Sequence, residues 1–319
     1  MMQNQQNNTV TVIGIDTGNK LIKTAHMVFH SGIEALAAPP AIQPKDPMDY
    51  IMINGNHYVV SAERLSYEKN KTENSNFLFL TLIGIAKELR YRKISPIGAR
   101  IVLGIGLPPG HINEVMKTRY LSYFRSNGGM FRFQCGGVTH SISIEDVMVN
   151  PQGLSSLIAH GPSLLNKSDL YVIDIGGYTA DIIHMLHGDP DLTKVISLDH
   201  GVIPMYQIIM NGMNAQFDRR ITEQQIDDVL MQRSEFFNAA HVDFIVRAAD
   251  AYIDRLFGKL VEMQIDLQSS FVVFAGGGAS LLQKALERYT SKTGDCAVIP
   301  DIRSNAIGYE ILANIRRAR

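Results

Sequence analysis

Apolar and polar residues follow one another along the chain in a pattern that predicts strands and helices in turn. Residues 10–16 and 21–29 are apolar runs separated by a glycine-containing turn, which is typical of a β-hairpin. A second hairpin of the same kind is expected over 170–186. Apolar residues recur at helical spacing in segments such as 77–90 and 242–267. This order predicts two α/β halves, each opening with a hairpin.

The remaining segments show the same two periodicities. A hairpin is expected over 49–61, and further strands over 100–107, 130–133, 140–149, 194–199, 271–275 and 297–299. Further helices are expected over 112–126, 151–165, 201–213, 222–233, 276–289 and 304–317. We expect domain I to comprise residues 1–160 together with the C-terminal helix 304–319, and domain II to comprise residues 161–303.

Composition narrows the class of protein. A chain of 319 residues with 45% hydrophobic and 19% charged residues is typical of a well-packed protein of two domains. The formal net charge of −1 provides no global field that would attract nucleic acid or an anionic membrane. The only cysteines, Cys135 and Cys296, do not form a CxxC motif, which favours a reducing cytoplasm. The polar segment 1–8 lacks a signal peptide's apolar core, and no apolar run reaches bilayer length.

The two predicted hairpins share an aspartate just before the turn. The first reads Asp16-Thr17-Gly18-Asn19-Lys20, and the second reads Asp174-Ile175-Gly176-Gly177-Tyr178-Thr179. Asp16 precedes Lys23 by seven residues, and Asp174 precedes Asp181 by seven. Glycine lets backbone N–H groups approach an anion, and carboxylates are ligands of hydrated divalent cations. The duplication therefore predicts two opposed phosphate-binding turns with a metal ion between them.

Four motifs, in this order, resemble those of the superfamily that contains actin, heat-shock chaperones and sugar kinases. They are Asp16–Lys20 with Lys23, Pro151-Gln152-Gly153, Asp174–Thr179, and Ala275-Gly276-Gly277-Gly278-Ala279. Within the superfamily they are most similar to bacterial plasmid-segregation actins of the ParM type, with archaeal actin-like ATPases next. The resemblance implies an actin/ribonuclease-H-like α/β fold, in which two related domains enclose a nucleotide cleft.

The resemblance also implies roles for single residues. Asp16 and Asp174 would hold Mg²⁺ through its water ligands. Gln152 would orient the attacking water and complete the catalytic set with the two aspartates. Because glutamine is not a strong base, slow hydrolysis is expected. The residues expected to bind the nucleotide are Thr17, Gly18, Asn19, Lys20, Lys23, Gly176, Gly177, Tyr178, Thr179, Gly276, Gly277, Gly278 and Ala279.

Some of these residues also have simpler interpretations. Gln152 could bond the backbone of its own helix N-terminus, and Lys23 could be a solvated strand end. Tyr178 could serve only to cover its turn. For Asp181, an exposed strand charge is favoured over a partner of the second turn.

One cluster has the composition of a metal site. It contains His184, His187, Asp189 and Asp191. A spacing of three along a strand places the two imidazoles on opposite faces, and the sequence Gly188-Asp189-Pro190-Asp191 favours a turn. We therefore expect no metal here.

The family resemblance implies an ATPase that polymerises into filaments on binding ATP and Mg²⁺, with GTP as the alternative nucleotide. Such a filament would segregate plasmid DNA through a DNA-bound adaptor protein, in the cytoplasm, without touching nucleic acid or membrane itself. One alternative is a small-molecule kinase of the same superfamily, which requires a catalytic aspartate where Gln152 stands. Another is a nucleotide-dependent cytoskeletal scaffold. A chaperone-type ATPase is disfavoured, since no substrate-binding domain follows Arg319 in this sequence.

Overall fold

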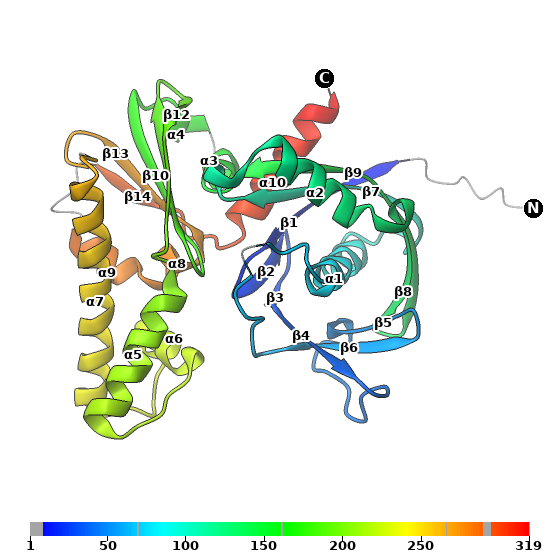
Figure 1. The fold of residues 1–319 in the computed structure, drawn as a ribbon, viewed down its shortest axis with the longest axis horizontal. Coiled ribbons are helices and arrows are strands. Elements are labelled where there is room, and N and C mark those ends of the chain that lie inside the picture. The colour runs from blue at the N-terminus through cyan, green and yellow to red at the C-terminus, as the bar shows by residue number, and fades with distance from the viewer. Residues whose placement is uncertain (1–8, 69, 161, 266, 290–294, 319) are drawn as a thin grey trace, which may run out of the picture. The chain divides into compact units, whose positions relative to one another are not determined.

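The computed structural model describes residues 9–68, 70–160, 162–265, 267–289 and 295–318 (Figure 1). The polar segment 1–8 lies outside these residues. The chain divides into two compact units, Met1–Pro151 with Asn305–Arg319, and Gln152–Ser304. This division groups residues 152–160 with the second unit, whereas the sequence-based domain boundaries, which stay a prediction, place them in domain I.

The first unit contains a nine-stranded sheet in the order β3-β2-β1-β7-β9-β8-β5-β6-β4. The parallel strands β1, β7 and β9 adjoin one another, and the other pairings in the sheet are antiparallel. The strands are β1 (Val10–Thr17), β2 (Leu21–Thr24), β3 (Val28–His30), β4 (Gly32–Leu36), β5 (Tyr50–Ile53), β6 (Asn56–Ser61), β7 (Ile97–Leu107), β8 (Met130–Cys135) and β9 (Val138–Pro151). The α-helices are α1 (Asn76–Tyr91), α2 (Glu114–Phe124) and α10 (Ser304–Ala318).

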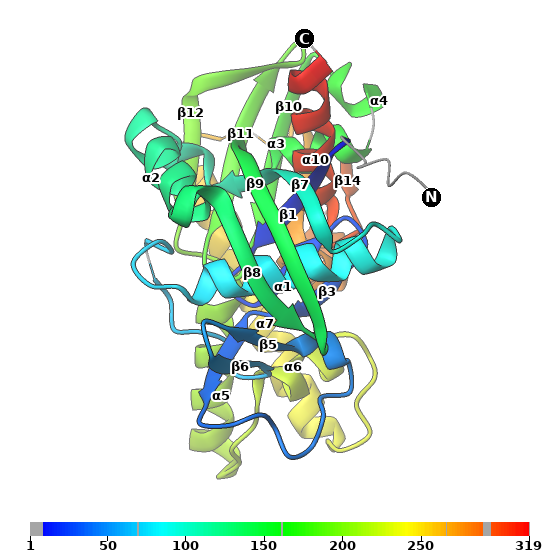
Figure 2. The same ribbon diagram turned by 90° about the vertical axis from the view of Figure 1, so that its right-hand side faces the viewer.

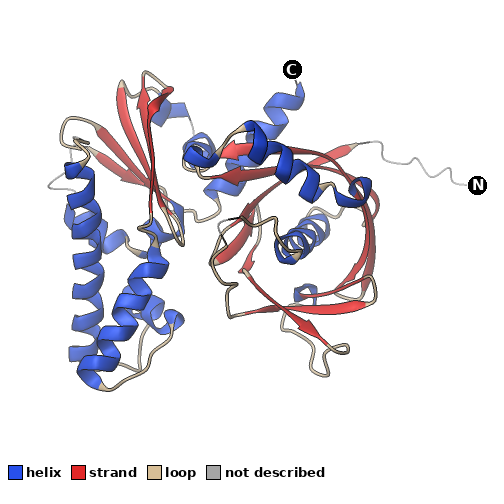
Figure 3. Cartoon of the chain, in the orientation of Figure 1, coloured by secondary structure: helices blue, strands red, loops and turns tan. Residues whose placement is uncertain are grey.

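Helix α1 forms the centre of the first unit's core. Figure 3 shows the strands of this unit curving around it. Alternate residues of β1, Ile13 and Ile15, are fully buried in the same cluster as the apolar residues of α1. On the opposite face of β1, Val12 packs with Ala313 of α10. The two faces of β1 are thus covered by different helices, and Asp16 lies on the same face as Val12 because side chains alternate along a strand.

The second unit contains a five-stranded sheet in the order β12-β11-β10-β13-β14. The strands are β10 (Asp169–Ile175), β11 (Ala180–Leu186), β12 (Asp189–Leu198), β13 (Phe271–Ala275) and β14 (Cys296–Val298). The helices are α3 (Leu154–His160), α4 (Pro162–Leu165), α5 (Val202–Phe217), α6 (Glu223–Leu230), α7 (Ala239–Glu262), α8 (Gly276–Leu281) and α9 (Gln283–Tyr289). In Figure 2, which is turned by 90° from Figure 1, strands β10, β11 and β12 and helices α5 and α7 of this unit can be followed.

Each face of the second sheet has its own helices. Ile173 and Ile175 of β10 pack in one cluster with residues of α5, α6, α7 and α9. Val172, which points to the other face, packs with Leu157 of α3. Asp174 follows the alternation of Val172, so that it lies at the end of the strand on the α3 face.

Several predicted elements differ from the observed ones; the helix expected over 276–289, for example, is the two helices α8 and α9. The helix expected over 151–165 is two short helices, α3 and α4. The turn expected over 188–191 is centred on His187 and Gly188, both at positive φ, which starts β12 at Asp189 instead of 194. The second strand expected over 21–29 is divided by a turn, in which Met27 N donates to Thr24 Oγ1 at 2.9 Å.

No helix in the described part of the chain combines the length and the hydrophobicity needed to cross a membrane.

Candidate functional site

The first hairpin places Asp16 directly opposite Lys23. The two residues are register partners in the antiparallel pairing of β1 with β2. Lys23 Nζ donates to Asp16 Oδ2 at 2.8 Å, and only 11% and 6% of the two side chains are exposed. The alternative interpretation of Lys23 as a solvated strand end is therefore wrong: it forms a nearly buried ion pair with the predicted metal-binding aspartate.

The turn of the first hairpin requires glycine at position 18. A Cβ atom there would lie 2.6 Å from the Leu21 carbonyl oxygen and 3.0 Å from Lys23 Nζ. A contact under 3.0 Å with backbone cannot be relieved by a side-chain rotation. The ion pair and the turn therefore pack against each other, with no space for a larger residue.

The carbonyl groups of this turn are held by side chains and by one amide. Ser31 Oγ donates to Asn19 O at 2.8 Å, and Ser31 N donates to Lys20 O at 3.3 Å. Lys71 Nζ donates to the carbonyl of Thr17. These bonds fix the turn from its carbonyl side.

Lys71 was not predicted from the sequence. It lies between β6 and α1, 54 residues from Thr17, in a segment without hydrophobic periodicity that could have indicated a role. The side chain is half-buried, and its amino group also lies 4.8 Å from the centroid of the Phe77 ring. Burial lowers the pKa of Lys71 to about 8, although the Asp16 carboxylate partly offsets this effect.

The second hairpin has the same register as the first but a different partner for its aspartate. Asp174 of β10 lies opposite Asp181 of β11. Both are buried, with 4% and 2% of their surfaces exposed, so the interpretation of Asp181 as an exposed strand charge is wrong. Asp181 accepts hydrogen bonds from the hydroxyls of Thr179 and Ser197.

The carboxyl group of Asp181 has a strongly raised pKa. Its pKa is raised to about 7, chiefly by burial and also by the neighbouring Asp174 carboxylate, against the lowering effect of the Ser197 and Thr179 hydroxyls. Near neutral pH, Asp181 is therefore divided between its neutral and ionised forms. A cation bound beside the two carboxyls would favour the ionised form.

Backbone amides hold the carbonyls of the second turn. The first amides of α5 and its N-cap Gly201 donate to three successive turn carbonyls. The bonds are Gly201 N to Tyr178 O at 2.8 Å, Val202 N to Gly176 O at 3.1 Å and Ile203 N to Gly177 O at 2.8 Å. Neutral backbone amides at the start of α5 thus hold the carbonyls of the second turn, as Ser31 and Lys71 hold those of the first.

The glycine triplet lies against Asp174. Strand β13 runs parallel to β10 and pairs Ala275 with Asp174. Gly276 follows at φ +88°, and a Cβ atom on it would lie 2.1 Å from Asp174 Oδ1. Gly276 must therefore be glycine, both for its backbone conformation and for the carboxylate beside it. The rest of the motif, Gly277, Gly278 and Ala279, forms the first turn of α8.

Gln152 belongs to the same neighbourhood. Its carbonyl accepts from Leu154 N at 2.9 Å, which places it just before α3. A Cβ atom on the next residue, Gly153, would lie 3.4 Å from Asp174 Cβ. The second unit therefore brings three of the four predicted motifs together around one buried carboxylate.

The donor groups suit Mg²⁺ held through water. Each unit has an aspartate at the end of a buried strand, next to a glycine-containing turn, and carboxylate oxygen is the preferred protein ligand of Mg²⁺. Among the described residues, no three His, Cys, Asp or Glu side chains are arranged as a direct metal cage. The fit is thus to a hydrated ion that keeps most of its water ligands.

The cluster around His184 has an internal explanation. His184 is buried and stacks on Tyr171 with ring centroids 4.4 Å apart. Its Nε2 lies 3.2 Å from Asp169 Oδ1 and its Nδ1 lies 3.6 Å from Asp191 Oδ2. His187 lies in the turn that follows β11.

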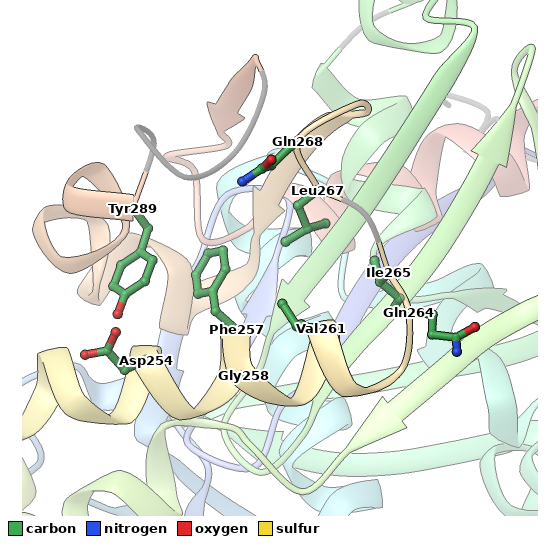
Figure 4. Close-up of a pocket in the computed structure, with 9 residues that line it drawn as sticks. All are labelled: Asp254, Phe257, Gly258, Val261, Gln264, Ile265, Leu267, Gln268 and Tyr289. Carbon is green, nitrogen blue, oxygen red and sulfur yellow. The ribbon is translucent and has the colours of Figure 1, made fainter.

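A separate pocket of about 550 Å³ lies at the C-terminal end of α7 (Figure 4). It is lined by Phe257 and Tyr289, whose rings stack with centroids 4.5 Å apart, and by Val261 and Asp254. None of the predicted site residues lines it.

Two family descriptions match the sequence. Residues 14–154 match the N-terminal domain of actin-like proteins. Residues 172–288 match the C-terminal part of the archaeal actin homologue MreB-like family. The matched segments contain the two hairpins and the glycine triplet. No curated protein sequence is significantly similar to this chain.

Solved structures of similar fold cover nearly the whole chain. The apo pSK41 ParM protein has a TM-score of 0.71 and 16% identity, over 97% of this chain and 98% of its own. Ta0583, an archaeal actin homologue solved in complex with ADP, has a TM-score of 0.70 and 16% identity, over 96% of this chain and 100% of its own. The Alp12 filament structure has a TM-score of 0.67 and 14% identity, over 96% of this chain and 98% of its own.

Proposed function

We propose a function on the premise that this chain belongs to the actin-like proteins: it is an ATPase that assembles into filaments when it binds ATP and Mg²⁺. Filaments of this kind would segregate plasmid DNA through an adaptor protein bound to the DNA. The family and the actin-like α/β fold are established by the sequence and structure comparisons. The catalytic activity, the assembly and the cargo are our inference.

One observation carries the proposal: the chain contains two β-hairpins of the same register. In each, a buried aspartate belongs to the last residue pair but one before the turn. Asp16 pairs with Lys23 and Thr17 with Ile22 in the first; Asp174 pairs with Asp181 and Ile175 with Ala180 in the second. Burying a carboxylate is costly unless a partner compensates it. Twice-repeated burial of this kind at glycine turns is typical of phosphate and magnesium recognition.

Several of the predicted residues have a defined task in this proposal. The backbone N–H groups of Gly18 and Asn19 in the first turn, and that of Gly177 in the second, would donate to phosphate oxygens, whereas Gly176 N donates to Thr179 O at 2.8 Å and keeps the second turn closed. Bound Mg²⁺ would neutralise charge on the phosphates, with Asp16 and Asp174 accepting hydrogen bonds from its water ligands. The backbone of Gly276–Ala279 would pass beside the ribose and α-phosphate.

Gln152 would position the attacking water. Its side-chain carbonyl accepts a hydrogen bond from the water and orients the oxygen lone pair towards the γ-phosphate. Its amide cannot take up the proton, so the rate enhancement would come mainly from electrostatic stabilisation. Turnover would then be slow, which suits a filament whose lifetime is set by hydrolysis.

Self-assembly follows from the same chemistry. A nucleotide that engages residues of both units would favour one conformation of the chain, and a conformation-dependent head-to-tail contact that does not close produces a filament. The filament form of Alp12 supports this part of the proposal. The net charge of −1 agrees with an adaptor, instead of the filament, contacting DNA. We also infer a cytoplasmic location, where ATP and Mg²⁺ are available and Cys135 and Cys296 stay free.

The test is right-angle light scattering of the purified protein, together with phosphate release, after addition of Mg²⁺ with ATP, GTP or ADP. We expect scattering to rise with ATP and slow phosphate release to follow the rise. Assembly without phosphate release would indicate the scaffold function. ATP consumption that depends on an added sugar or other small alcohol, without scattering, would indicate the kinase.

A further inference from the structure

The amino group of Lys71 is incompletely satisfied. An ammonium group carries three N–H donors. Among the described residues, its only hydrogen-bond acceptor is the Thr17 carbonyl, and the face of the Phe77 ring lies 4.8 Å away. The carboxylates of Asp16 and Glu68 also act on its charge, but neither accepts a hydrogen bond from it. A cation placed against a single carbonyl and a ring retains capacity for an anionic ligand.

A comparison of the two turns indicates that a turn carbonyl can be held without a positively charged donor such as Lys71. In the second hairpin, the equivalent task is performed by neutral amides, such as Ile203 N donating to Gly177 O at 2.8 Å. The first hairpin uses a lysine, whose burial is costlier than that of an amide. The positive charge therefore has a use beyond fixing the turn.

The segment that carries Lys71 has hydrogen bonds within itself and, on its C-terminal side, to Tyr123. Asn70 Oδ1 accepts from the Thr72 amide and hydroxyl, at 3.2 and 2.7 Å. Tyr123 Oη donates to Asn74 O at 2.7 Å and accepts from Leu78 N at 2.7 Å. These bonds hold the segment in place, so that Lys71 reaches the turn without having to be recruited on binding.

Lys23 is occupied in this arrangement. Its ammonium is paired with Asp16 at 2.8 Å, so its charge is compensated by a carboxylate at hydrogen-bond distance. Lys71 instead bonds a neutral carbonyl at the same turn and forms no ion pair among the described residues, although the carboxylates of Asp16 and Glu68 lie near enough to act on its charge. Of these two lysines, Lys71 is the one whose charge is better placed to meet a phosphate.

We propose that Lys71 is a phosphate-binding residue of the first unit, which adds a second lysine to the turn Thr17–Lys20 and sets its affinity for a polyphosphate. On binding, one of its N–H donors bonds a terminal phosphate oxygen while the Thr17 carbonyl retains another. This inference rests on the proposed function, because the anion is the polyphosphate of the nucleotide.

The experiment measures the dissociation constants of ATP–Mg²⁺, ADP–Mg²⁺ and adenosine by calorimetry for the full chain and for Lys71→Met. We expect ATP binding to weaken about 10- to 100-fold, in keeping with the loss of one charge-assisted bond, and adenosine binding to change less than about twofold. Lys167→Met is the matched control, since Lys167 also lies over an aromatic ring, that of Phe271 at 4.4 Å, but on an exposed position of the second unit. Its ATP affinity should equal that of the wild type.

Two results would overturn the proposal. One is a folded Lys71→Met variant that binds ATP as tightly as the wild type. The other is equal weakening of ATP and adenosine, which indicates a structural role. A wild-type chain that binds neither ATP nor GTP would instead contradict the proposed function itself.

A second measurement needs no variant. The wild-type chain is labelled with acetic anhydride at limiting concentration, and the extent of acetylation of each lysine is read by mass spectrometry. We expect ATP–Mg²⁺, but not adenosine, to slow the acetylation of Lys71 severalfold and to leave Lys167 unchanged. Equal labelling of Lys71 with and without ATP would contradict the inference even if Lys71→Met does not fold.

Discussion

The two hairpins have the same geometry and opposite electrostatics. In the first, Asp16 lies opposite a lysine and forms a closed ion pair. In the second, Asp174 lies opposite another carboxyl group, and the pKa of that partner, Asp181, is raised to about 7 because both are buried. The same backbone register therefore carries a compensated carboxylate in one unit and a carboxyl pair in the other.

Under the proposed function, this difference would give the two hairpins different tasks in binding. A carboxyl pair gains most from a divalent cation, because the cation removes both the desolvation cost and the mutual repulsion. A carboxylate already paired with Lys23 gains less from the metal, and Lys71, which bonds the same turn, is the lysine that we propose for phosphate. We therefore expect the second hairpin to dominate Mg²⁺ binding and the first to contribute relatively more to the polyphosphate.

The largest effect is expected for Asp174→Asn, which keeps the shape of the side chain and removes its charge. ATP-dependent light scattering should be lost, with ATP–Mg²⁺ affinity reduced on the order of 100-fold. Asp189→Asn is the control, because Asp189 is an exposed carboxylate of the same sheet. Normal assembly of the Asp174 variant would show that the second carboxyl pair does not hold the metal.

The next effect is a loss of stability caused by crowding the Asp174 carboxylate. Gly276→Ala introduces a side chain at φ +88°, with its Cβ 2.1 Å from Asp174 Oδ1. We expect the free energy of unfolding, measured by urea denaturation, to fall by about 3 kcal/mol. Gly277→Ala has open space around its Cβ and should change stability by less than about 0.5 kcal/mol. Similar values for the two variants would refute this account of the glycine triplet.

Lys23→Met tests how much the buried ion pair with Asp16 contributes to stability. The substitution leaves a nearly buried carboxylate without its partner, which should cost about 2–3 kcal/mol of unfolding free energy. Lys117→Met provides the comparison, since Lys117 pairs with Glu114 at the same 2.8 Å but with 45% and 87% of the side chains exposed. That exposed pair should contribute less than about 0.5 kcal/mol. Equal losses would show that burial does not distinguish the two ion pairs.

The smallest effect is a pH dependence that only the second hairpin should have. Because the pKa of Asp181 is raised to about 7 in the folded chain, the folded state retains its proton while the unfolded chain loses it. Stability from this group is present below the ordinary pKa of aspartate and is lost as the pH rises through 7. Between pH 5 and pH 8, the wild type should lose roughly 2 kcal/mol more than Asp181→Asn. Parallel stability curves for the two proteins would show that Asp181 is ionised in both states.

Local patterns in the sequence were sufficient to predict much of the fold. The hairpin at 10–24, the helix that follows Thr222 and the strand leading to Gly276 are determined by residues close together in the chain, and all three are present. The expected actin-like family and α/β fold are likewise confirmed.

The errors arose where distant residues decide the outcome. Asp181 is buried because β12 adds to the sheet outside β11 and makes β11 an interior strand. Lys71 reaches Thr17 through a long connection without regular structure. Neither tertiary contact leaves a periodic signal in the sequence, so neither could have been predicted from spacing.

The central claim is that the two aspartates act on one ATP–Mg²⁺, and a calorimetric double-mutant cycle tests it most directly. ATP–Mg²⁺ binding is measured for the wild type, Asp16→Asn, Asp174→Asn and the double variant. We predict one nucleotide per chain and a loss in the double variant that is smaller than the sum of the single losses, because both groups hold the same ion. Two nucleotides per chain, or strictly additive losses, would contradict the claim.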